Sequence, residues 1–338
     1  MTQTESPDSS DITVAALYHF AIVDDPAALQ PLILEQCEQQ GLKGTILLAN
    51  EGINGTIAGS ADAIGSVIAY LRSLSQFSGL DAKYSTADKM PFLRMKVRLK
   101  KEIVSMGVDG IDAARAKGEY VDPADWNSVI ADPDTVLIDT RNAYEVAIGS
   151  FDGAINPHTE TFRDFPAWFD DFSRELQEKS DKQPRIAMFC TGGIRCEKAT
   201  AYVKAQGFED VHHLKGGILK YLENVPGDES RWTGDCFLFD QRVAVGHGLR
   251  QSDYDQCHAC RMPLNAEDRK SEFYVPGEAC PHCHESRTDA QRQRYRERQK
   301  QVEKAAREGR THLAQKIDSN AQSGWDEESS WDQDIDWK

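Results

Sequence analysis

The sequence predicts a mixed α/β protein with three folded parts: an N-terminal α+β domain, a central parallel α/β domain and a small C-terminal segment with paired cysteines. Three observations predict this class. Strand-like and helix-like runs alternate over roughly the first 225 residues. A glycine-rich cysteine loop separates a buried strand from a helix near residue 190. Two C-x-x-C pairs follow after residue 250.

Composition limits the class of protein before any motif is considered. The 338 residues carry a formal net charge of -16, which argues against indiscriminate nucleic-acid binding but is compatible with a local basic face. No apolar run reaches the roughly 18 residues of a membrane span, and residues 1–11 are polar rather than signal-like. Eight cysteines, four of them in C-x-x-C pairs, are typical of a reducing compartment. We therefore expect a soluble, cytoplasmic protein without membrane contact.

The N-terminal domain, expected at residues 13–110, follows a disordered segment over residues 1–12. Its pattern is strand, helix, strand, turn, strand, helix, strand, which predicts a ferredoxin-like α+β sandwich. The expected strands are 15–23, 45–49, 56–58 and 94–100, the helices 26–40 and 61–74, and the turn 50–55.

The last of these strands alternates strictly between apolar and basic residues. Met95, Val97 and Leu99 are expected to face inward. The opposite face carries four cations: Arg94, Lys96, Arg98 and Lys100. Such one-sided charge is compatible with an RNA-phosphate contact and equally with an ordinary solvated sheet face.

The central domain is expected at residues 120–226. Buried strands at 135–139, 185–189 and 211–214 alternate with helices, one beginning after Asp122 and another at 167–179. This order predicts a parallel sheet with helices on both faces. The cysteine loop then lies at the carboxyl end of a strand, where open α/β sheets keep their sites.

Cys190 stands at the switch from strand to helix. Amide groups of the loop and of the first helical turn favour its thiolate, and Arg195 adds a fixed positive charge. The loop between them consists of Thr191, Gly192, Gly193 and Ile194, whose glycines allow the backbone to curl around the sulfur. A tight turn with a structural cysteine is the alternative. Cys196 could resolve an oxidised or persulfidated Cys190, or simply pack at the helix start.

The central domain resembles a rhodanese domain, and five motifs carry the resemblance: Asp139-Thr140-Arg141, Glu145, Gly153-Ala154-Ile155-Asn156-Pro157, Cys190 to Arg195, and Leu214-Lys215-Gly216-Gly217. The C-x4-R spacing is similar to that of the sulfur-handling members, whose loop cradles a persulfide. The related phosphatases carry one more loop residue. The resemblance implies that Asp139, Arg141 and Glu145 brace the loop. One departure is Gly149-Ser150-Phe151, where many members have Gly-His-Ile.

Over residues 13 to 300 the chain resembles the rhodanese-domain tRNA uridine hydroxylases. The N-terminal domain, the sequence CTGGIRCEKA at 190–199 and the cysteine-paired tail carry this resemblance. It implies that a monooxygenase-type oxidoreductase converts the wobble uridine (U34) of tRNA to 5-hydroxyuridine, with molecular oxygen as co-substrate. The family's essential cysteine maps onto Cys190. The sequence identifies no electron donor or redox cofactor, because it shows neither a convincing non-haem iron motif nor a dinucleotide fingerprint.

Two other functions are compatible with the same loop. A rhodanese-type sulfurtransferase would pass persulfide sulfur from Cys190 to an acceptor, and a non-catalytic tRNA-binding module would leave the cysteine unused. Within the hydroxylase reading, Cys190 could add to C6 of uracil as a thiolate, or act as a persulfide or an oxidised thiol. The product found in tRNA discriminates between hydroxylation and thiolation.

The C-terminal part contains C-x2-C, nineteen residues and C-x2-C, within a segment expected at 232–286. Four thiolates in this spacing predict a structural zinc site, and the ligands are Cys257, Cys260, Cys280 and Cys283. An iron–sulfur cluster, a redox pair or an unmetallated hairpin is the alternative. A basic helix at 287–317 and a disordered acidic tail with three tryptophans at 318–338 complete the chain.

Overall fold

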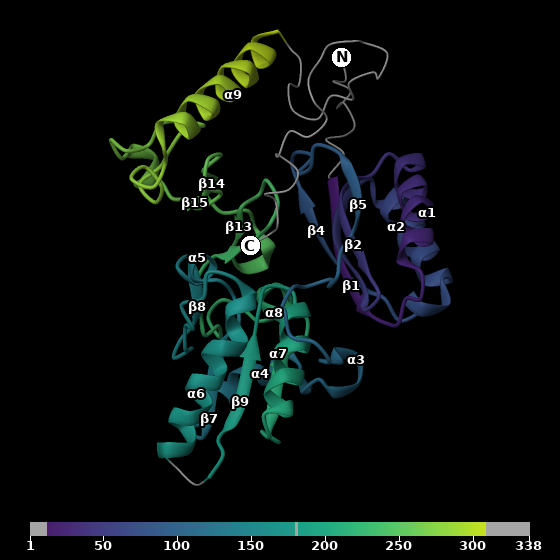
Figure 1. Cartoon of the computed structure of the whole chain (residues 1–338), viewed down its shortest axis with the longest axis vertical. Coiled ribbons are helices and arrows are strands. Elements are labelled where there is room, and N and C mark those ends of the chain that lie inside the picture. Colours follow the sequence, from purple (N-terminus) through teal and green to yellow (C-terminus); the bar gives the residue numbers. More distant parts are fainter. Residues whose placement is uncertain (1–11, 180–181, 309–338) are drawn as a thin grey trace, which may run out of the picture. The chain divides into compact units, whose positions relative to one another are not determined.

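The structure is a computed structural model that describes residues 12–179 and 182–308. Its chain divides into two compact units at Ser252 (Figure 1). The segments expected to be disordered, 1–12 and 318–338, lie outside the described residues, except that Ile12 is the first residue of a strand. No helix in the described part of the chain is long and apolar enough to cross a membrane.

The N-terminal domain is the predicted ferredoxin-like sandwich. Its five-stranded sheet has the order β4-β1-β3-β2-β5, in which only the β2–β5 pair is parallel. The elements are β1 (Ile12–Phe20), α1 (Pro26–Gln39), β2 (Lys43–Ala49), β3 (Gly52–Gly59), α2 (Ala61–Ser73), β4 (Asp81–Ala87) and β5 (Met95–Leu99).

One face of this sheet packs against both helices and the other is free of them (Figure 1). Strand residues alternate between the two faces. Ala15 and Leu17 of β1 pack into the core with α1 and α2, so Tyr18 lies on the helix-free face. Ala16 lies two residues before Tyr18 and therefore on the same face of β1. Ala16 pairs with Lys83 in the antiparallel register, so the Lys83 side chain of β4 also lies on the helix-free face.

The structure corrects the N-terminal prediction in four places, the first of which is that edge strand β4 was not among the expected strands. β1 spans Ile12–Phe20 rather than 15–23. The turn expected at 50–55 is only two residues long, because β3 begins at Gly52 and pairs with Ala49 across it. Leu99 is 44% exposed instead of inward, since it is the last residue of an edge strand.

The central domain contains the predicted parallel sheet, with the order β6-β10-β9-β7. After the short α3 (Ala113–Ala116), its elements are β6 (Glu119–Val121), α4 (Pro123–Ala131), β7 (Thr135–Asp139), α5 (Ala143–Val146), β8 (Gly149–Phe151), α6 (Phe165–Lys179), β9 (Arg185–Phe189), α7 (Ile194–Ala205), β10 (Val211–Leu214) and α8 (Gly217–Asn224). The helix after the cysteine loop, α7, begins at Ile194, so Arg195 and Cys196 lie in its first turn.

Helices cover both faces of this parallel sheet, as predicted. Ala187 and Phe189 of β9 pack with α4 and α8 on one face, whereas Ile186 and Met188 pack with α6 and α7 on the other. Strand β9 is therefore buried on both sides, which explains its apolar run Ile186–Phe189. The cysteine loop follows β9 at the carboxyl edge of the sheet.

The remaining strands are short. β11 (Trp232–Gly234) pairs antiparallel with β8 of the central domain, and β12 (Cys236–Phe237) forms a hairpin with β13 (Ala244–Val245). The second unit contains β14 (Asp255–Gln256), β15 (Pro263–Leu264) and α9 (Asp289–Arg307). The part of the expected basic helix beyond residue 308 lies outside the described residues.

Candidate active site and metal centre

Cys190 is completely buried at the end of β9, one turn before α7. The backbone N–H of Gly193 donates a hydrogen bond to its Sγ over 3.1 Å. Gly193 has φ +100, a conformation that glycine adopts without steric cost, and this conformation turns its N–H toward the sulfur. The structure therefore brings together all the contiguous loop residues that the sequence predicted, from Cys190 to Cys196.

The surroundings of Cys190 favour the thiolate. Burial opposes ionisation, but the Cys196 thiol, the Arg195 charge and the backbone N–H groups of Cys196 and Gly193 outweigh it and lower the pKa of Cys190 to about 6. Cys196 shows the opposite shift, because burial and the adjacent Cys190 sulfur raise its pKa well above the ordinary value. At neutral pH the pair therefore holds one thiolate, on Cys190, and one thiol, on Cys196.

A buried ion pair holds Arg195 in place. Its two terminal nitrogens lie 2.6 and 2.7 Å from the two carboxylate oxygens of Glu145. Glu145 also accepts hydrogen bonds from the Thr191 hydroxyl at 3.2 Å and from the Asn142 backbone N–H at 3.1 Å. Burial opposes ionisation of Glu145, but Arg195 and these donors outweigh it and lower its pKa. The carboxylate thus ties the first turn of α7 and the cysteine loop to α5.

Asp139 and Arg141 form a second, fully buried ion pair behind the loop. The Arg141 guanidinium lies 2.7 Å from Asp139 and donates to the carbonyl oxygens of Gly149 and Glu145. These bonds hold the chain between β7 and β8, and their acceptors are Asp139, Glu145 and Gly149 rather than Cys190. The pair braces this segment, and its role in supporting the cysteine loop stays a prediction.

The N-terminus of α8 holds the cysteine loop through backbone hydrogen bonds. Backbone N–H groups of Ile218 and Leu219 donate to the carbonyl oxygens of Cys190 and Thr191 at 3.0 and 3.1 Å. Gly217 makes this approach possible, because an added Cβ would lie 2.5 Å from the Cys190 carbonyl oxygen. This explains physically why glycines follow Lys215 in this motif.

Cys196 is completely buried, and its Sγ lies 3.6 Å from the Thr140 hydroxyl oxygen. Its hydrogen bond with the Cys190 sulfur contributes to the pKa shifts of both residues. Cys196 therefore packs at the helix start and also lies next to the Cys190 sulfur. This geometry is compatible with a packing role and with a role as the resolving thiol.

Two residues of the N-terminal domain reach this site, and the sequence did not reveal them. The Tyr18 hydroxyl donates to Glu197 in the first turn of α7 over 2.9 Å, and Lys83 Nζ donates to the Gly192 carbonyl oxygen over 2.8 Å. Tyr120 and Lys117 also bind Glu197, at 2.6 and 3.2 Å. No sequence motif marks Tyr18 or Lys83, since each is one polar residue in an ordinary strand.

Lys198 occupies a buried ionic cluster rather than a solvent-facing or substrate-facing position. Its side chain is 3% exposed, and its Nζ lies 2.5 Å from Glu102 and 2.8 Å from Glu51. It also donates to the carbonyl oxygen of Val104 at 3.0 Å. The cluster joins α7 to the segment that follows β5.

The cationic strand lies apart from these contacts. Lys96 and Arg98 are on the helix-free face of β5, opposite Met95 and Val97, and both are partly buried. Arg94 is exposed and Lys100 is partly buried, just outside the two ends of the strand. An RNA-binding role for these residues stays a prediction.

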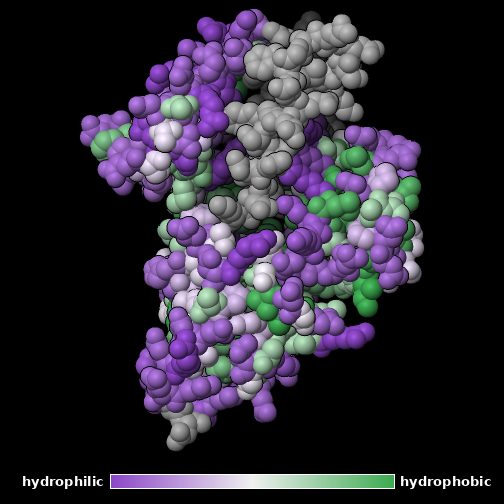
Figure 2. Space-filling view, viewed as in Figure 1, coloured by the Kyte–Doolittle hydropathy of each residue, from purple (hydrophilic) through white to green (hydrophobic). Residues whose placement is uncertain are grey.

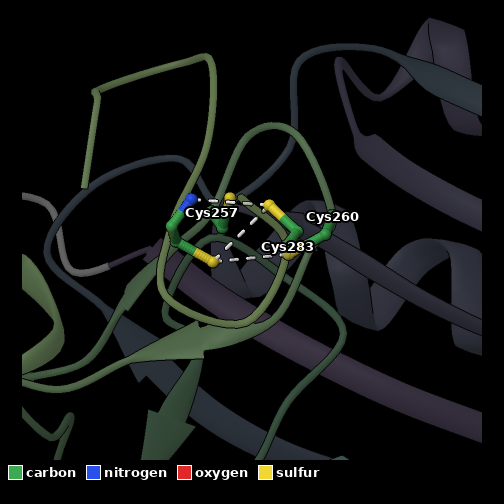
Figure 3. Close-up of side chains that lie close together, drawn as sticks. Cys257, Cys260 and Cys283 are labelled. Atoms are coloured by element: carbon green, nitrogen blue, oxygen red, sulfur yellow. Dashed lines mark hydrogen bonds between the residues drawn. The ribbon is translucent and has the colours of Figure 1, made fainter. Parts of the chain in front are cut away.

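The four predicted metal ligands converge in the second unit (Figure 3). Their sulfur atoms all lie within 4.8 Å of one another, and Cys280 Sγ is 3.6 Å from Cys260 Sγ and 3.8 Å from Cys283 Sγ. A tetrahedral site with metal–sulfur bonds of about 2.3 Å places its sulfurs about 3.8 Å apart. The donor set and its spacing therefore fit a metal ion bound by four cysteines.

The nearby histidines have other partners. His284 stacks on Phe273 with ring centroids 3.9 Å apart, and His282 lies 3.5 Å from Asp268.

Helix α9 in the same unit is strongly hydrophilic (Figure 2). Two of its arginines bind within the unit: Arg296 donates to the Glu278 carboxylate at 2.8 Å, and Arg298 donates to the His258 carbonyl oxygen at 2.6 Å.

Comparison with known protein families supports the assignment of both folds. Residues 12–103 match the UPF0176 acylphosphatase-like domain, and residues 122–224 match the rhodanese-like domain. Among solved structures, a rhodanese-related protein from Thermoplasma volcanium is 20% identical (TM-score 0.24), covering 32% of this chain and 93% of that chain. A human single-domain sulfurtransferase is 21% identical (TM-score 0.27), covering 32% of this chain and 99% of that chain. The two family matches define the class: a rhodanese-like domain with a loop cysteine, joined to an acylphosphatase-like domain.

Curated relatives make the assignment narrower. A protein from Gluconobacter oxydans is 56% identical over 307 residues, which cover 90% of this chain and 98% of the relative. A protein from Rhizobium leguminosarum is 56% identical, covering 90% of this chain and 97% of the relative, and one from Acaryochloris marina is 53% identical, covering 91% and 97%. Each of them is named tRNA uridine(34) hydroxylase. The chain belongs to the tRNA uridine(34) hydroxylase family.

Proposed function

We propose that this protein is an enzyme that hydroxylates uridine 34 of tRNA to 5-hydroxyuridine. The single observation that supports this most strongly is a completely buried cysteine with a pKa of about 6, in a family named for that hydroxylation. The reaction class is that of an oxidoreductase of monooxygenase type. The setting is cytoplasmic, where the tRNA pool is found.

Cys190 is the reacting group in this proposal. Its thiolate adds to C6 of the uracil ring, which leaves C5 electron-rich and able to take an oxygen atom derived from O2. Loss of the thiolate from C6 and of the proton from C5 then restores the ring. A two-electron donor in solution supplies the electrons that reduce the second oxygen atom to water.

The neighbouring side chains keep Cys190 in its reactive form. Arg195 supplies the positive charge, and Glu145 fixes the position of Arg195 through the ion pair at 2.6 Å. Cys196 remains protonated and donates to the thiolate, which supports a role as a hydrogen-bond partner and, after oxidation of Cys190, as the resolving thiol.

The four-cysteine cluster holds a structural zinc ion in this proposal. Thiolate ligands in closed tetrahedral sites are typical of zinc, and such an ion stabilises a segment whose own apolar core is small. That core consists of Leu264, Ala279 and the cysteines themselves, with few partly buried neighbours. The cationic strand around Lys96 and Arg98 would contact tRNA phosphates.

The experiment is nucleoside mass spectrometry of tRNA from cells that lack the protein and are complemented with variants. Wild type and Cys37→Ala, a buried cysteine of the N-terminal core, restore 5-hydroxyuridine, whereas Cys190→Ser does not. Hydroxylation and exchange of oxygen for sulfur give the same nominal mass. Accurate mass and labelling with oxygen-18 gas therefore distinguish the hydroxylase from a sulfurtransferase. Restoration of 5-hydroxyuridine by Cys190→Ser would refute the proposal.

A further inference from the structure

Lys83 of β4 reaches the cysteine loop from the helix-free face of the N-terminal sheet. Its Nζ lies 2.8 Å from the carbonyl oxygen of Gly192 and 4.8 Å from the centroid of the Tyr18 ring. A carbonyl oxygen and an aromatic face are both favourable neighbours for an ammonium group. Lys83 is thereby held at one backbone atom of the loop rather than pointing into solvent.

The oxygen that Lys83 binds belongs to the peptide group that also binds the reactive sulfur. The Gly192 carbonyl and the Gly193 N–H are two ends of one planar unit, and that N–H donates to Cys190 Sγ over 3.1 Å. A cation on the carbonyl oxygen polarises the amide and strengthens its N–H as a donor. A peptide between two glycines can also rotate at little steric cost, so a ligand on its oxygen fixes which way the N–H points.

We propose that Lys83 is a positioning residue for the Cys190 thiolate. It orients and polarises the Gly192–Gly193 peptide so that the Gly193 N–H faces the sulfur. The N-terminal domain thus takes part in preparing the nucleophile as well as in any contact with RNA. The inference deepens the proposed function and rests on Cys190 being the reacting group.

Other charged or titratable groups also face Cys190. Arg195 and Cys196 act from α7, and Tyr18 acts from β1 with its hydroxyl bonded to Glu197. Burial lowers the pKa of Lys83, while Asp81, the Cys190 sulfur and Glu197 oppose that shift. Only Lys83 among them binds the Gly192 oxygen, so its effect can be separated from theirs by substitution at position 83.

The test is the pH dependence of Cys190 ionisation in the full-length protein. Two readouts measure it: the rate at which iodoacetamide labels the Cys190 peptide, and the thiolate absorbance that is present in wild type and absent in Cys190→Ser. In Lys83→Met the midpoint rises by about one pH unit, a tenfold loss of thiolate at pH values below both midpoints. Lys83→Gln keeps an N–H donor without the charge and gives a smaller rise. Lys83→Arg keeps both and leaves the midpoint near its original value.

The control is Lys89→Met, which removes an exposed lysine beyond the end of β4 and leaves the midpoint unchanged. The hydroxylation rate supplies a second readout: the deficit of Lys83→Met shrinks as the pH rises through its new midpoint, whereas a displaced loop stays inactive at every pH. A folded Lys83→Met or Lys83→Gln protein with the wild-type midpoint overturns the inference. The titration needs no tRNA, so this outcome is independent of whether 5-hydroxyuridine is the product.

Discussion

At the scale of single residues, the site combines burial of a sulfur with the means to ionise it. Cys190 has no exposed surface, yet its pKa is lowered to about 6 by the thiol of Cys196, the Arg195 charge and two backbone donors, against the opposing effect of burial. Burial alone would give an inert thiol. The distinction between a structural and a reactive cysteine therefore depends on these donors.

This ionisation predicts the pH dependence of the reaction. In the proposed reaction the thiolate is the reactive form, so the single-turnover rate of tRNA hydroxylation is expected to rise with pH through about 6 and to be level above it. The same ionisation stabilises the folded state at pH values above the ordinary thiol pKa, and that contribution is lost as the pH falls through about 6. A rate that does not change through this midpoint, measured with enzyme in excess over tRNA, would contradict the assignment.

Sequence reasoning recovered the residues that lie next to one another along the chain. Cys190, Arg195 and Cys196 belong to one short loop and helix start, and the two C-x-x-C pairs have a spacing that is recognisable without a structure. Tyr18 and Lys83 could not be predicted, because their role depends on which face of the sheet meets the cysteine loop. One polar side chain in a strand carries no record of a partner more than a hundred residues away.

At the scale of elements, the start of α8 shapes the cysteine loop by close backbone approach. Gly217 has φ +68, and an added Cβ would collide with the carbonyl oxygens of Cys190 and Thr191 at 2.5 and 2.6 Å. Gly41, after α1, has nearly the same φ of +67 but nothing within 4 Å of its added Cβ. A substitution at Gly41 therefore tests backbone strain alone, whereas the same substitution at Gly217 tests backbone strain together with a steric collision.

We expect Gly217→Ala to destabilise the protein more than Gly41→Ala. Both substitutions carry a strain of about 1 kcal/mol from the left-handed conformation, and only the first also displaces the loop. Urea denaturation measures the stability of both variants, and the hydroxylation rate reports the loop. If both variants lost the same stability and the same activity, the predicted collision of the Cβ added at position 217 with the loop carbonyl oxygens would have no effect on the protein, and the expectation would be wrong.

Removal of the zinc ion that we propose for the four-cysteine cluster is expected to act on the second unit alone. Without metal–thiolate bonds, the segment that carries Cys257 and Cys283 loses most of its stabilisation, since its apolar cluster is small. Hydrogen exchange after chelation should rise across residues 253–308 and stay unchanged across the parallel sheet of the first unit. Cys257→Ser should give the same pattern and lower the metal content; retained zinc in that variant would argue against the assigned ligand set.

Element prediction was accurate for three strands of the parallel sheet and weaker for edge strand β4 of the N-terminal sheet. The strands β7, β9 and β10 were predicted with their observed bounds, and β9, whose apolar run is buried on both faces, is the clearest of them. Edge strand β4 was not predicted, since its sequence DAKYSTA has no apolar stripe and buries only Ala87 fully. The residues on its helix-free face are polar because they meet polar groups of the same unit: Lys83 binds the cysteine loop, and Ser85 binds Arg242 at 2.6 Å.

At the scale of the first unit, the N-terminal domain closes the site as well as supporting it. Tyr18 and Lys83 contact the cysteine loop and the first turn of α7, and Arg242 of the β12–β13 hairpin binds β4. Gly193 lies so close to Tyr18 that an added Cβ would be 3.0 Å from the hydroxyl oxygen. Since Cys190 has no exposed surface, we expect a uridine to reach it through local loosening of these contacts.

Weakening one of these contacts should make Cys190 more accessible. Tyr18→Phe keeps the ring but removes the hydrogen bond to the Glu197 carboxylate, and bonds to charged groups of this kind contribute about 1.5 kcal/mol, so alkylation of Cys190 should accelerate about tenfold. Tyr84→Phe is the control, because Tyr84, the residue after Lys83 in β4, is 46% exposed. Equal alkylation rates in wild type and Tyr18→Phe would mean that another contact limits entry.

Complete enclosure of the sulfur has a consequence for survival of the enzyme in air. A thiolate that works alongside oxygen, as we propose for Cys190, risks being driven to sulfinic acid by stray peroxide, and that damage is irreversible for most proteins. With no surface presented to the medium, Cys190 meets dissolved oxidants only during the brief openings that also admit RNA. Self-inactivation is then coupled to turnover, so an idle enzyme keeps its nucleophile intact.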